Sequence, residues 1–322
     1  MQTATSPDVP HGVRQVEIGP ERDGQRIDNA LMTILKGVPK SMIYRLLRTG
    51  QVRVNGKRAK PDTRLTQGDM LRIPPVRVAE RTAEQAASQG AMAAAAEAVI
   101  FEDKHFLVID KPTGMASHGG SGVSHGAIEL LRQARPKEHL ELVHRLDRDT
   151  SGVLVFAKTR AGLTGLQAAI RANEVTKQYL CLMVGHPPKA RFDVNVPLQK
   201  SILQGGERMV RVSEGGKPSL TFFHEMEQYS GARLMQATLG TGRTHQIRVH
   251  AAHIGHPLAG DPKYGDKEAN KRFRNLGLHR LFLHASHMSF ELDGRAYGFS
   301  APLPDDLKDF LDTLAAKRKS GR

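Results

Sequence analysis

The amino-acid sequence predicts an α+β protein with two domains, and three observations support this prediction. Apolar residues with helical spacing begin at residue 27, and short basic strand patterns follow them. A stretch rich in Ala, residues 79–98, comes next. From Val99 onward, strand-like apolar runs alternate with helical patterns. We therefore expect a small domain at residues 19–78 and a larger, strand-rich domain at residues 99–318.

Three further segments are expected to extend or connect these domains. Residues 1–18 contain Pro, Ser and Thr without clear periodicity, which indicates a flexible arm. Residues 79–98 indicate a linker, and part of it is free to form a helix because Ala has the highest helix propensity. Residues 319–322 are expected to form a basic tail.

The composition excludes several classes of protein. With 39% hydrophobic residues, the chain of 322 residues can bury a substantial core. It has no apolar run long enough to span a bilayer, and its first residues lack the apolar centre of a signal peptide. The single cysteine, Cys181, rules out an intramolecular disulfide and fits a reducing compartment. These features predict a cytoplasmic protein without membrane association.

The distribution of charge predicts a polyanionic partner. The chain has a formal net charge of +14. Residues 21–81 hold fourteen Lys and Arg against six Asp and Glu, which is a net charge of +8 on a fifth of the chain. A charge that served only solubility would be spread more evenly, so this concentration favours a nucleic-acid-binding module.

Two helices are predicted at the start of this basic module. The first has one apolar face, formed by Ile27, Leu31, Ile34 and Leu35. The second is expected to begin with Ser41 as its N-cap and to end at Gly50. Arg45 and Arg48 are three residues apart and share the face opposite the apolar residues of this helix.

A basic hairpin is predicted next. Val52 and Val54 alternate with polar residues, and Asn55-Gly56 is a strong signal for a two-residue turn. The run SMIYRLLRTGQVRVNGKRAKPDTRLTQGDMLRI resembles the S4 RNA-binding domain. The resemblance implies contacts with the RNA backbone by six residues: Arg26, Arg45, Arg48, Arg53, Asn55 and Lys57. An ordinary solvated helix face is the alternative interpretation for Arg45 and Arg48.

The larger domain is predicted to consist mainly of strands. The run IFEDKHFLVIDKP indicates two short strands around a charged turn, and SGVLVFAKT and VTKQYLCLMVG indicate two longer ones. Later strand candidates are SLTFFHEME, ARLMQATLG, LFLHASHMSFEL and RAYGFSAP. Helices are predicted at Thr244–His253, with Thr244 as the N-cap, and at Leu307–Ala316.

The densest polar segment, VHRLDRDTSG, lies directly before an apolar strand and contains two carboxylates, Asp147 and Asp149. Charges that enter a core in this way usually belong to a functional site or to a structural network of ion pairs. The residues alone leave both interpretations open.

This segment resembles the catalytic motif of the large-subunit ribosomal pseudouridine synthases. Three other runs resemble motifs of that family in the right order: IDKPTGMASHGG, KQYLCLMVG and GTGRTHQIRVHAAHIGHPLAGDPKYG. With the S4 module, the resemblance covers roughly residues 20–318. The runs LKGVPKSMIYR, RIPPVRVAER and HGGSGVS narrow it to one branch of the family.

The resemblance implies both a fold and a reaction. The catalytic domain is expected to contain a mixed, mainly antiparallel sheet with flanking helices. The reaction is the isomerisation of specific uridines of 23S ribosomal RNA to pseudouridine. It breaks the N1–C1′ bond, rotates the uracil and rejoins it through C5. Because this involves no net redox change and no loss of a group, neither a cofactor nor a metal is implied.

Site residues are carried over by position in the motifs. Asp147 matches the catalytic carboxylate, and Arg248 matches the arginine that pairs with it; a nearby cation favours the ionised form. Tyr179 matches the tyrosine that stacks on the base. Arg145 matches the arginine that fills the gap left by the flipped uridine, and Ile247 is expected to support the base.

Two alternative functions are weaker. A non-enzymatic RNA-binding factor would be expected to lose active-site residues, whereas this chain keeps Asp147, Tyr179 and Arg248. A metal-dependent nuclease would use Asp147 with Asp149, but a matching ligand set is missing. The cluster of His245, His250, His253 and His256 has neither an HExxH motif nor cysteine partners. The expected partner is 23S ribosomal RNA or its precursor particle, bound by a monomer without an obligatory protein partner.

Overall fold

The computed structural model describes residues 12–35, 38, 40–76, 87–120, 125–202 and 208–320. The chain divides into two compact units, Met1–Ala86 and Ala87–Arg322. Among the described residues, no helix combines the length and the apolar character needed to cross a membrane.

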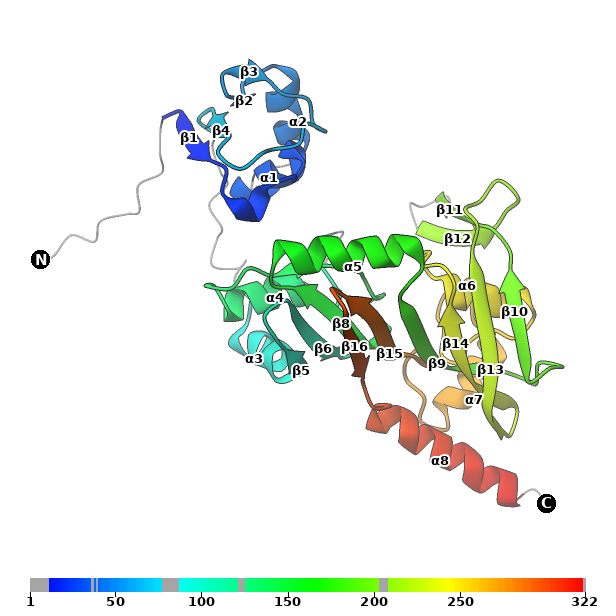
Figure 1. Ribbon diagram of the computed structural model, residues 1–322. Helices are drawn as coiled ribbons and strands as arrows, with labels where there is room; N and C mark the ends of the chain where they lie inside the picture. The colour runs from blue at the N-terminus through cyan, green and yellow to red at the C-terminus, as the bar shows by residue number, and fades with distance from the viewer. Residues whose placement is uncertain are drawn as a thin grey trace, which may run out of the picture. The chain divides into compact units, whose positions relative to one another are not determined.

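The N-terminal unit contains two helices packed on a four-stranded antiparallel sheet of order β1-β4-β2-β3 (Figure 1). The helices are α1 (Ile27–Ile34) and α2 (Lys40–Arg48), and a 3-10 turn, η1 (Pro20–Arg22), precedes them. The strands are β1 (Arg14–Glu17), β2 (Arg53–Val54), β3 (Lys57–Arg58) and β4 (Met70–Ile73). The apolar faces predicted for both helices are confirmed, since Ile27, Leu31, Ile43 and Leu47 are buried in one core.

The turn between β2 and β3 confirms the predicted hairpin. Asn55 and Gly56 have φ values of 49° and 77°, the left-handed conformation that a tight two-residue hairpin turn requires. Asn55 is held there by its side chain, which accepts a hydrogen bond from the Met70 amide and donates one to Asp69.

Two predictions for this unit are wrong in detail. The expected arm at residues 1–18 overlaps strand β1, because Arg14–Glu17 pairs with β4 and completes the sheet. Four residues are too few for their alternation to stand out in the sequence, so only the pairing reveals the strand. The predicted N-cap Ser41 lies inside α2, which already includes Lys40. Residues 1–11 and Pro39 lie outside the described residues.

The C-terminal unit is built on a ten-stranded sheet, with the strand order β10-β13-β14-β9-β15-β8-β6-β5, β16 beside β15 and β7 beside β8. All neighbouring strands are antiparallel except β15 and β8, so the expected mixed, mainly antiparallel sheet is confirmed. The strands of the path are β5 (Val99–Glu102), β6 (Phe106–Lys111), β8 (Ser151–Ala157), β9 (Thr176–Val184), β10 (Arg191–Asn195), β13 (Leu220–Tyr229), β14 (Ala232–Leu239) and β15 (Leu283–Leu292). The others are β7 (Glu141–Leu142) and β16 (Arg295–Ser300), and β11 (Leu198–Ile202) and β12 (Arg208–Val212) form a separate hairpin.

In the described part of this unit, six helices accompany the sheet: α3 (Gln89–Glu97), α4 (Ala127–Ala134), α5 (Arg160–Ala172), α6 (Gln246–His253), α7 (Lys267–Arg274) and α8 (Asp305–Ser320). Figure 1 shows α5 running along the central strands. In β6, Phe106 and Val108 pack in the cluster that includes α5, whereas Leu107 and Ile109 pack with α4 on the other face. Burial on both faces explains why the central strands are continuous apolar runs in the sequence.

The expected linker at residues 79–98 ends in a helix that belongs to the C-terminal unit. Helix α3 contacts α4, and Ala95 is completely buried in the main core. Alanine is small enough to let two helices approach closely, so the Ala-rich composition has a packing role here. Residues 79–86 lie outside the described residues.

Candidate active site

The loop that carries Asp147 lies between β7 and β8. Several hydrogen bonds fix it to the run IDKPTGMASHGG. The Ser117 hydroxyl accepts a hydrogen bond from the Leu146 amide at 2.9 Å and donates one to the Leu146 carbonyl at 2.7 Å. Gly152, at the start of β8, has a φ of +109°, and a Cβ atom there would lie 2.2 Å from the Ala285 carbonyl oxygen. Glycine at this position therefore lets β8 lie directly against β15.

Lys111 also holds this loop in place, through a hydrogen bond to the Arg148 carbonyl. Its buried Nζ atom donates hydrogen bonds to the carbonyls of Pro112, Met115 and Arg148, at 2.9, 2.7 and 3.2 Å. Burial lowers the pKa of this ammonium group to about 7. The run IDKPTGMAS thus serves as a support for the segment that carries Asp147.

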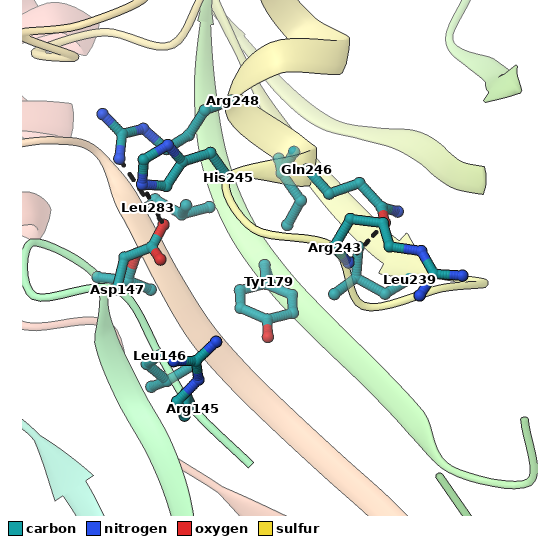
Figure 2. A pocket seen from close by; sticks show the side chains of 12 residues that line it. Arg145, Leu146, Asp147, Tyr179, Leu239, Arg243, His245, Gln246, Arg248 and Leu283 are labelled. Atoms are coloured by element: carbon teal, nitrogen blue, oxygen red, sulfur yellow. Dashed lines mark hydrogen bonds and ion pairs between the residues drawn. The ribbon is translucent and has the colours of Figure 1, made fainter. Parts of the chain in front are cut away.

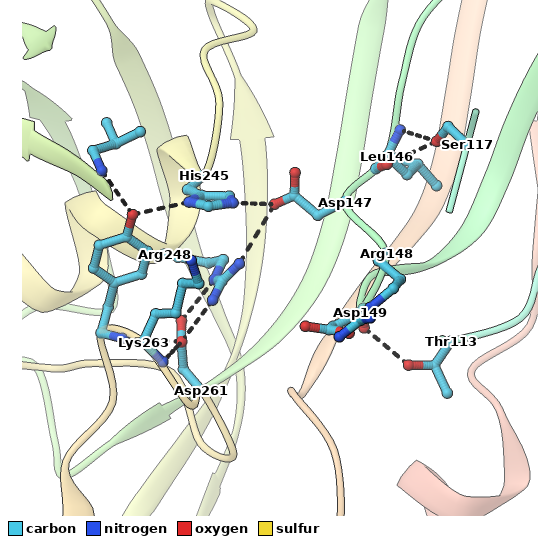
Figure 3. Close-up of polar contacts among 12 residues, drawn as sticks. Thr113, Ser117, Leu146, Asp147, Arg148, Asp149, His245, Arg248, Asp261 and Lys263 are labelled. Carbon is cyan, nitrogen blue, oxygen red and sulfur yellow. Dashed lines mark hydrogen bonds and ion pairs between the residues drawn. The ribbon is translucent and has the colours of Figure 1, made fainter. Parts of the chain in front are cut away.

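Two side chains from the start of α6 face Asp147. Its Oδ2 atom is 3.7 Å from Nη1 of Arg248 and 3.7 Å from Nε2 of His245 (Figure 3). The Asp147 side chain is 30% exposed, whereas that of Arg248 is only 3% exposed. The carboxylate therefore lies at the surface of a site whose cation is embedded in the protein.

Arg248 has its closest ion-pair partner in Asp261. Its Nε and Nη2 atoms both donate to the Asp261 carboxylate at 2.8 Å, and the Asp261 side chain is completely buried. Burial opposes ionisation, but the hydrogen bonds and charge of Arg248 hold the pKa of Asp261 below its ordinary value. Asp261 also accepts the amides of Lys263 and Tyr264. The DPKYG segment thus supplies the carboxylate that holds Arg248 in place.

The N-cap of helix α6 lies one residue later than predicted. The N-cap is His245, with φ at 53°, rather than Thr244. Gln246 explains the shift, because its side chain accepts hydrogen bonds from Thr241 and the Arg243 amide and donates to the Leu220 carbonyl. These contacts close the GTGRT loop ahead of the helix.

Tyr179 comes from β9 and forms the floor of the pocket between these segments. Figure 2 shows its ring between the loop of Asp147 and the start of α6. Burial, with the negative charge of Asp147, raises the pKa of the Tyr179 hydroxyl well above its ordinary value. The phenol therefore stays protonated at neutral pH.

The five residues that the sequence assigned to catalysis and to the base line one pocket: Arg145, Asp147, Tyr179, Ile247 and Arg248. Leu146, Leu239 and Leu283 add apolar surface. Nη1 of Arg145 lies 3.2 Å from Nε2 of His118. Apolar walls, one carboxylate and several cations suit a planar, uncharged ring attached to a polyanion.

Asp149, the other carboxylate of the motif, is not among the residues that line this pocket. Its carboxylate pairs with the neighbouring Arg148 at 3.3 Å, and its carbonyl accepts a hydrogen bond from Thr113. Among the described residues, no group of three or more His, Cys, Asp and Glu side chains is arranged to hold a metal ion. The geometry thus separates Asp147 from Asp149.

Comparison with known proteins identifies the family. The family model described as RNA pseudouridylate synthase matches residues 105–253, and the S4 domain matches residues 25–71. The chain is 51% identical over 312 residues to ribosomal large subunit pseudouridine synthase C of Escherichia coli K12, covering 95% of this chain and 98% of the relative. The protein of the same name from Haemophilus influenzae is 49% identical over 306 residues, covering 94% and 95% of the two chains.

The chain belongs to the RNA pseudouridine synthase family. It is an isomerase, as the motifs predicted, and its relatives fall in the branch that the narrower resemblance indicated. A solved structure, human RNA pseudouridylate synthase domain containing 4, is 25% identical with a TM-score of 0.59, covering 70% of this chain and 97% of its own. A second solved structure, human RNA pseudouridylate synthase domain containing 1, is 26% identical with a TM-score of 0.56, covering 64% of this chain and 83% of its own.

The six residues predicted to contact RNA in the S4 unit fall into two groups. Arg45, Arg48, Arg53 and Lys57 are exposed. Arg26 and Asn55 are exposed as well, but their side chains bond to carboxylates: the Arg26 guanidinium donates to Asp28 at 2.7 and 3.2 Å, and the Asn55 amide donates to Asp69 at 2.7 Å.

The sequence interpretation missed three residues of the site. These are Asp261, His245 and Tyr264, of which His245 was considered only as part of a histidine cluster for a metal. The ring of Tyr264 lies beneath the Arg248 guanidinium at 5.1 Å, and its hydroxyl is 2.9 Å from Nδ1 of His245. The only available signal was their place in two motif runs, GRTHQIR and DPKYG.

Proposed function

We propose that this chain converts specific uridines of 23S ribosomal RNA to pseudouridine, with Asp147 as the catalytic carboxylate. The observation that carries the proposal is the meeting of Asp147, Arg248 and Tyr179 in one pocket. The printed names of relatives that align over nearly the whole chain support the choice of large-subunit RNA. We further propose that the enzyme acts as a cytoplasmic monomer, on the RNA or its precursor particle, without an obligatory protein partner.

The chemistry needs an ionised carboxylate and no redox partner. Three routes are open to Asp147: attack on C1′, addition to the base, or help in removing a proton from the sugar. Each requires the ionised form of the carboxylate, and the Arg248 cation lies 3.7 Å from its Oδ2 atom. Every route conserves the atoms of the nucleotide: the N1–C1′ bond breaks, a C5–C1′ bond forms, and the C5 proton moves to N1.

The remaining pocket residues suit the handling of a flipped base. Tyr179 offers a flat ring for stacking and, since its hydroxyl stays protonated, a hydrogen-bond donor. Ile247 is 4% exposed and supplies an apolar wall. Arg145 is exposed at the rim, where its guanidinium can fill the gap left in the RNA stack. Flipping costs a few kcal/mol, so an inserted side chain offsets part of that cost.

We assign binding of the RNA backbone to the S4 unit. Its exposed cations, Arg45, Arg48, Arg53 and Lys57, suit phosphate contacts, which give affinity that falls with salt concentration. Selection of particular uridines is assigned to the catalytic unit, where a base must enter the pocket. Loops with accessible bases are the expected targets.

The test uses large-subunit RNA transcript without added metal. The native protein is expected to form pseudouridine at a few sites, mapped by chemical derivatisation and primer extension. Asp147→Asn and Asp147→Ala are expected to form none while keeping the native circular dichroism spectrum. Asp149→Asn is the matched control, since this carboxylate does not line the pocket. An inactive native protein would refute the function, activity in Asp147→Ala would refute the residue, and cleaved RNA would favour a nuclease.

A further inference from the structure

His245 is a second neighbour of the candidate catalytic carboxylate. Its Nε2 atom and Nη1 of Arg248 both lie 3.7 Å from the same Asp147 oxygen, Oδ2 (Figure 3). Both contacts go to Oδ2 rather than to Oδ1. The two oxygens of Asp147 are therefore distinct: Oδ2 faces the start of α6, and Oδ1 is the oxygen that we expect to face a bound nucleotide.

The hydrogen atom on the His245 ring can be assigned from its second nitrogen. Nδ1 lies 2.9 Å from the Tyr264 hydroxyl oxygen, which also accepts a hydrogen bond from the Val210 amide at 2.9 Å. Elsewhere in the described part of the chain the Tyr264 hydroxyl has no acceptor, so its single hydrogen is donated to Nδ1. Nδ1 is then the unprotonated nitrogen, and a neutral ring carries its hydrogen on Nε2, facing Asp147.

The surroundings of His245 favour this neutral ring. Its side chain is 16% exposed. Burial lowers the pKa of His245, and this outweighs the opposing attraction of the Asp147 carboxylate, while the Arg248 and Lys263 cations act in the same direction as burial. Arg248 already places a positive charge beside Asp147. A neutral His245 ring therefore adds a donor that orients the carboxylate without adding a second buried cation.

The backbone at His245 is specialised for this placement. Its φ of 53° is a left-handed conformation that is uncommon for residues other than Gly, although His adopts it more often than most. This conformation begins α6 and turns the ring back toward the loop of Asp147 (Figure 2). A non-glycine residue in such a conformation at a functional site is a common form of built-in strain.

We infer that His245 is a positioning residue for the isomerisation, a role that rests on the proposed function. Its Nε2–H group, oriented by Tyr264 and the Val210 amide, fixes Oδ2 of Asp147 together with Arg248. Oδ1 is thereby presented to the reacting nucleotide. Because Val210 belongs to β12, the β11–β12 hairpin is connected to the catalytic carboxylate through Tyr264 and His245.

Three variants test this arrangement. His245→Asn keeps a residue that tolerates positive φ, but its amide is too short to reach Asp147. His245→Gln places an amide nitrogen near the position of Nε2. Tyr264→Phe removes the orienting hydroxyl and keeps an aromatic ring beneath Arg248.

Single-turnover rates at saturating RNA are the main measurement. His245→Asn is expected to lower the rate by about 10- to 100-fold, because it removes a polar contact that orients a charged group, with unchanged RNA affinity. His245→Gln should recover part of this loss. Tyr264→Phe should lose about tenfold alone and nothing further in a His245→Asn background, since both act through one donor. A native rate in His245→Asn, or losses that multiply in the double variant, would overturn the inference.

Nitrogen NMR of protein labelled with ¹⁵N-histidine gives a readout independent of turnover. The His245 signals, identified by their loss in His245→Asn, are expected to show a protonated Nε2 and an unprotonated Nδ1. Tyr264→Phe should alter them. A ring protonated on Nδ1 would overturn the inference. If the native protein made no pseudouridine, the proposed function would fail, and the tautomer measurement would still decide the geometry.

Discussion

Arg48 of the S4 unit is exposed and has no ion-pair partner among the described residues, whereas Arg248 of the catalytic unit lies between two carboxylates. The same contrast extends to the lysines. Lys57 is exposed on a hairpin, and Lys111 is completely buried with three carbonyl acceptors. Cations of one chemical type are thus used in two ways in one chain.

The difference teaches how each unit contributes to function. An exposed cation keeps its hydration and adds little to folding stability, so it is free to bind a phosphate. A buried cation has lost its hydration and depends on its partners, so removing one partner is strongly destabilising. We therefore expect changes in the S4 unit to alter RNA affinity and changes around Arg248 and Lys111 to alter rate and stability.

The largest effect is expected for Asp261→Asn. This change leaves Arg248 without its closest counterion and should destabilise the fold by about 3–5 kcal/mol. The guanidinium is then free to move onto Asp147. Because a displacement of about 1 Å can lower a rate by about 100-fold, the single-turnover rate of the surviving folded protein should fall by that order. Denaturant unfolding and single-turnover kinetics measure the two effects.

Asp149→Asn is the control for that comparison. Asp149 pairs with an Arg148 side chain that is 62% exposed, so we expect less than about 1 kcal/mol of change and a native rate. Equal losses in Asp261→Asn and Asp149→Asn would contradict the distinction between buried and exposed pairs.

A smaller, pH-dependent effect is expected at Lys111. Its pKa is about 7 in the folded protein, below the ordinary lysine value of 10.5, so between these values the unfolded chain binds more protons. Stability from this group therefore increases as pH rises. Relative to Lys111→Met, the native protein should gain about 2 kcal/mol between pH 7 and pH 9. Guanidinium unfolding of both proteins at each pH measures this gain; a difference independent of pH would show that Lys111 has an ordinary pKa.

The sequence predicted best what is determined locally. Helices α1 and α2 follow from apolar spacing, and the turn at Asn55-Gly56 follows from residues that tolerate positive φ. The central strands were recognisable because burial on both faces leaves continuous apolar runs. Helix α5, with its Thr159 cap, was not predicted individually.

The candidate site was predictable only where a motif matched. Asp147, Tyr179 and Arg248 come from three segments that are far apart in the sequence, and composition does not indicate that they meet. Asp261 lies thirteen residues after Arg248 with a helix end between them, so its ion pair exists only in the folded chain. The left-handed backbone at His245 was not predicted either, because the predicted N-cap, Thr244, placed His245 inside the helix.

The smallest effect is expected on the exposed side of the comparison, at Arg45 and Arg48. Replacing both by Ala should weaken RNA binding and lower the slope of log affinity against log salt by about 1 for each phosphate that the variant no longer binds. The rate at saturating RNA and the unfolding midpoint should stay native. Filter binding over a series of salt concentrations, with single-turnover kinetics, measures both.

Arg26→Ala supplies the matched comparison within the same unit. Arg26 is also partly exposed, but it is bonded to Asp28, whose side chain is only 3% exposed. Its loss should lower the unfolding midpoint of the S4 unit and leave the salt slope unchanged, the reverse of the Arg45 and Arg48 pair. If Arg26, Arg45 and Arg48 all lowered the salt slope equally, the ion pair with Asp28 would not separate a structural arginine from RNA-binding arginines in this unit.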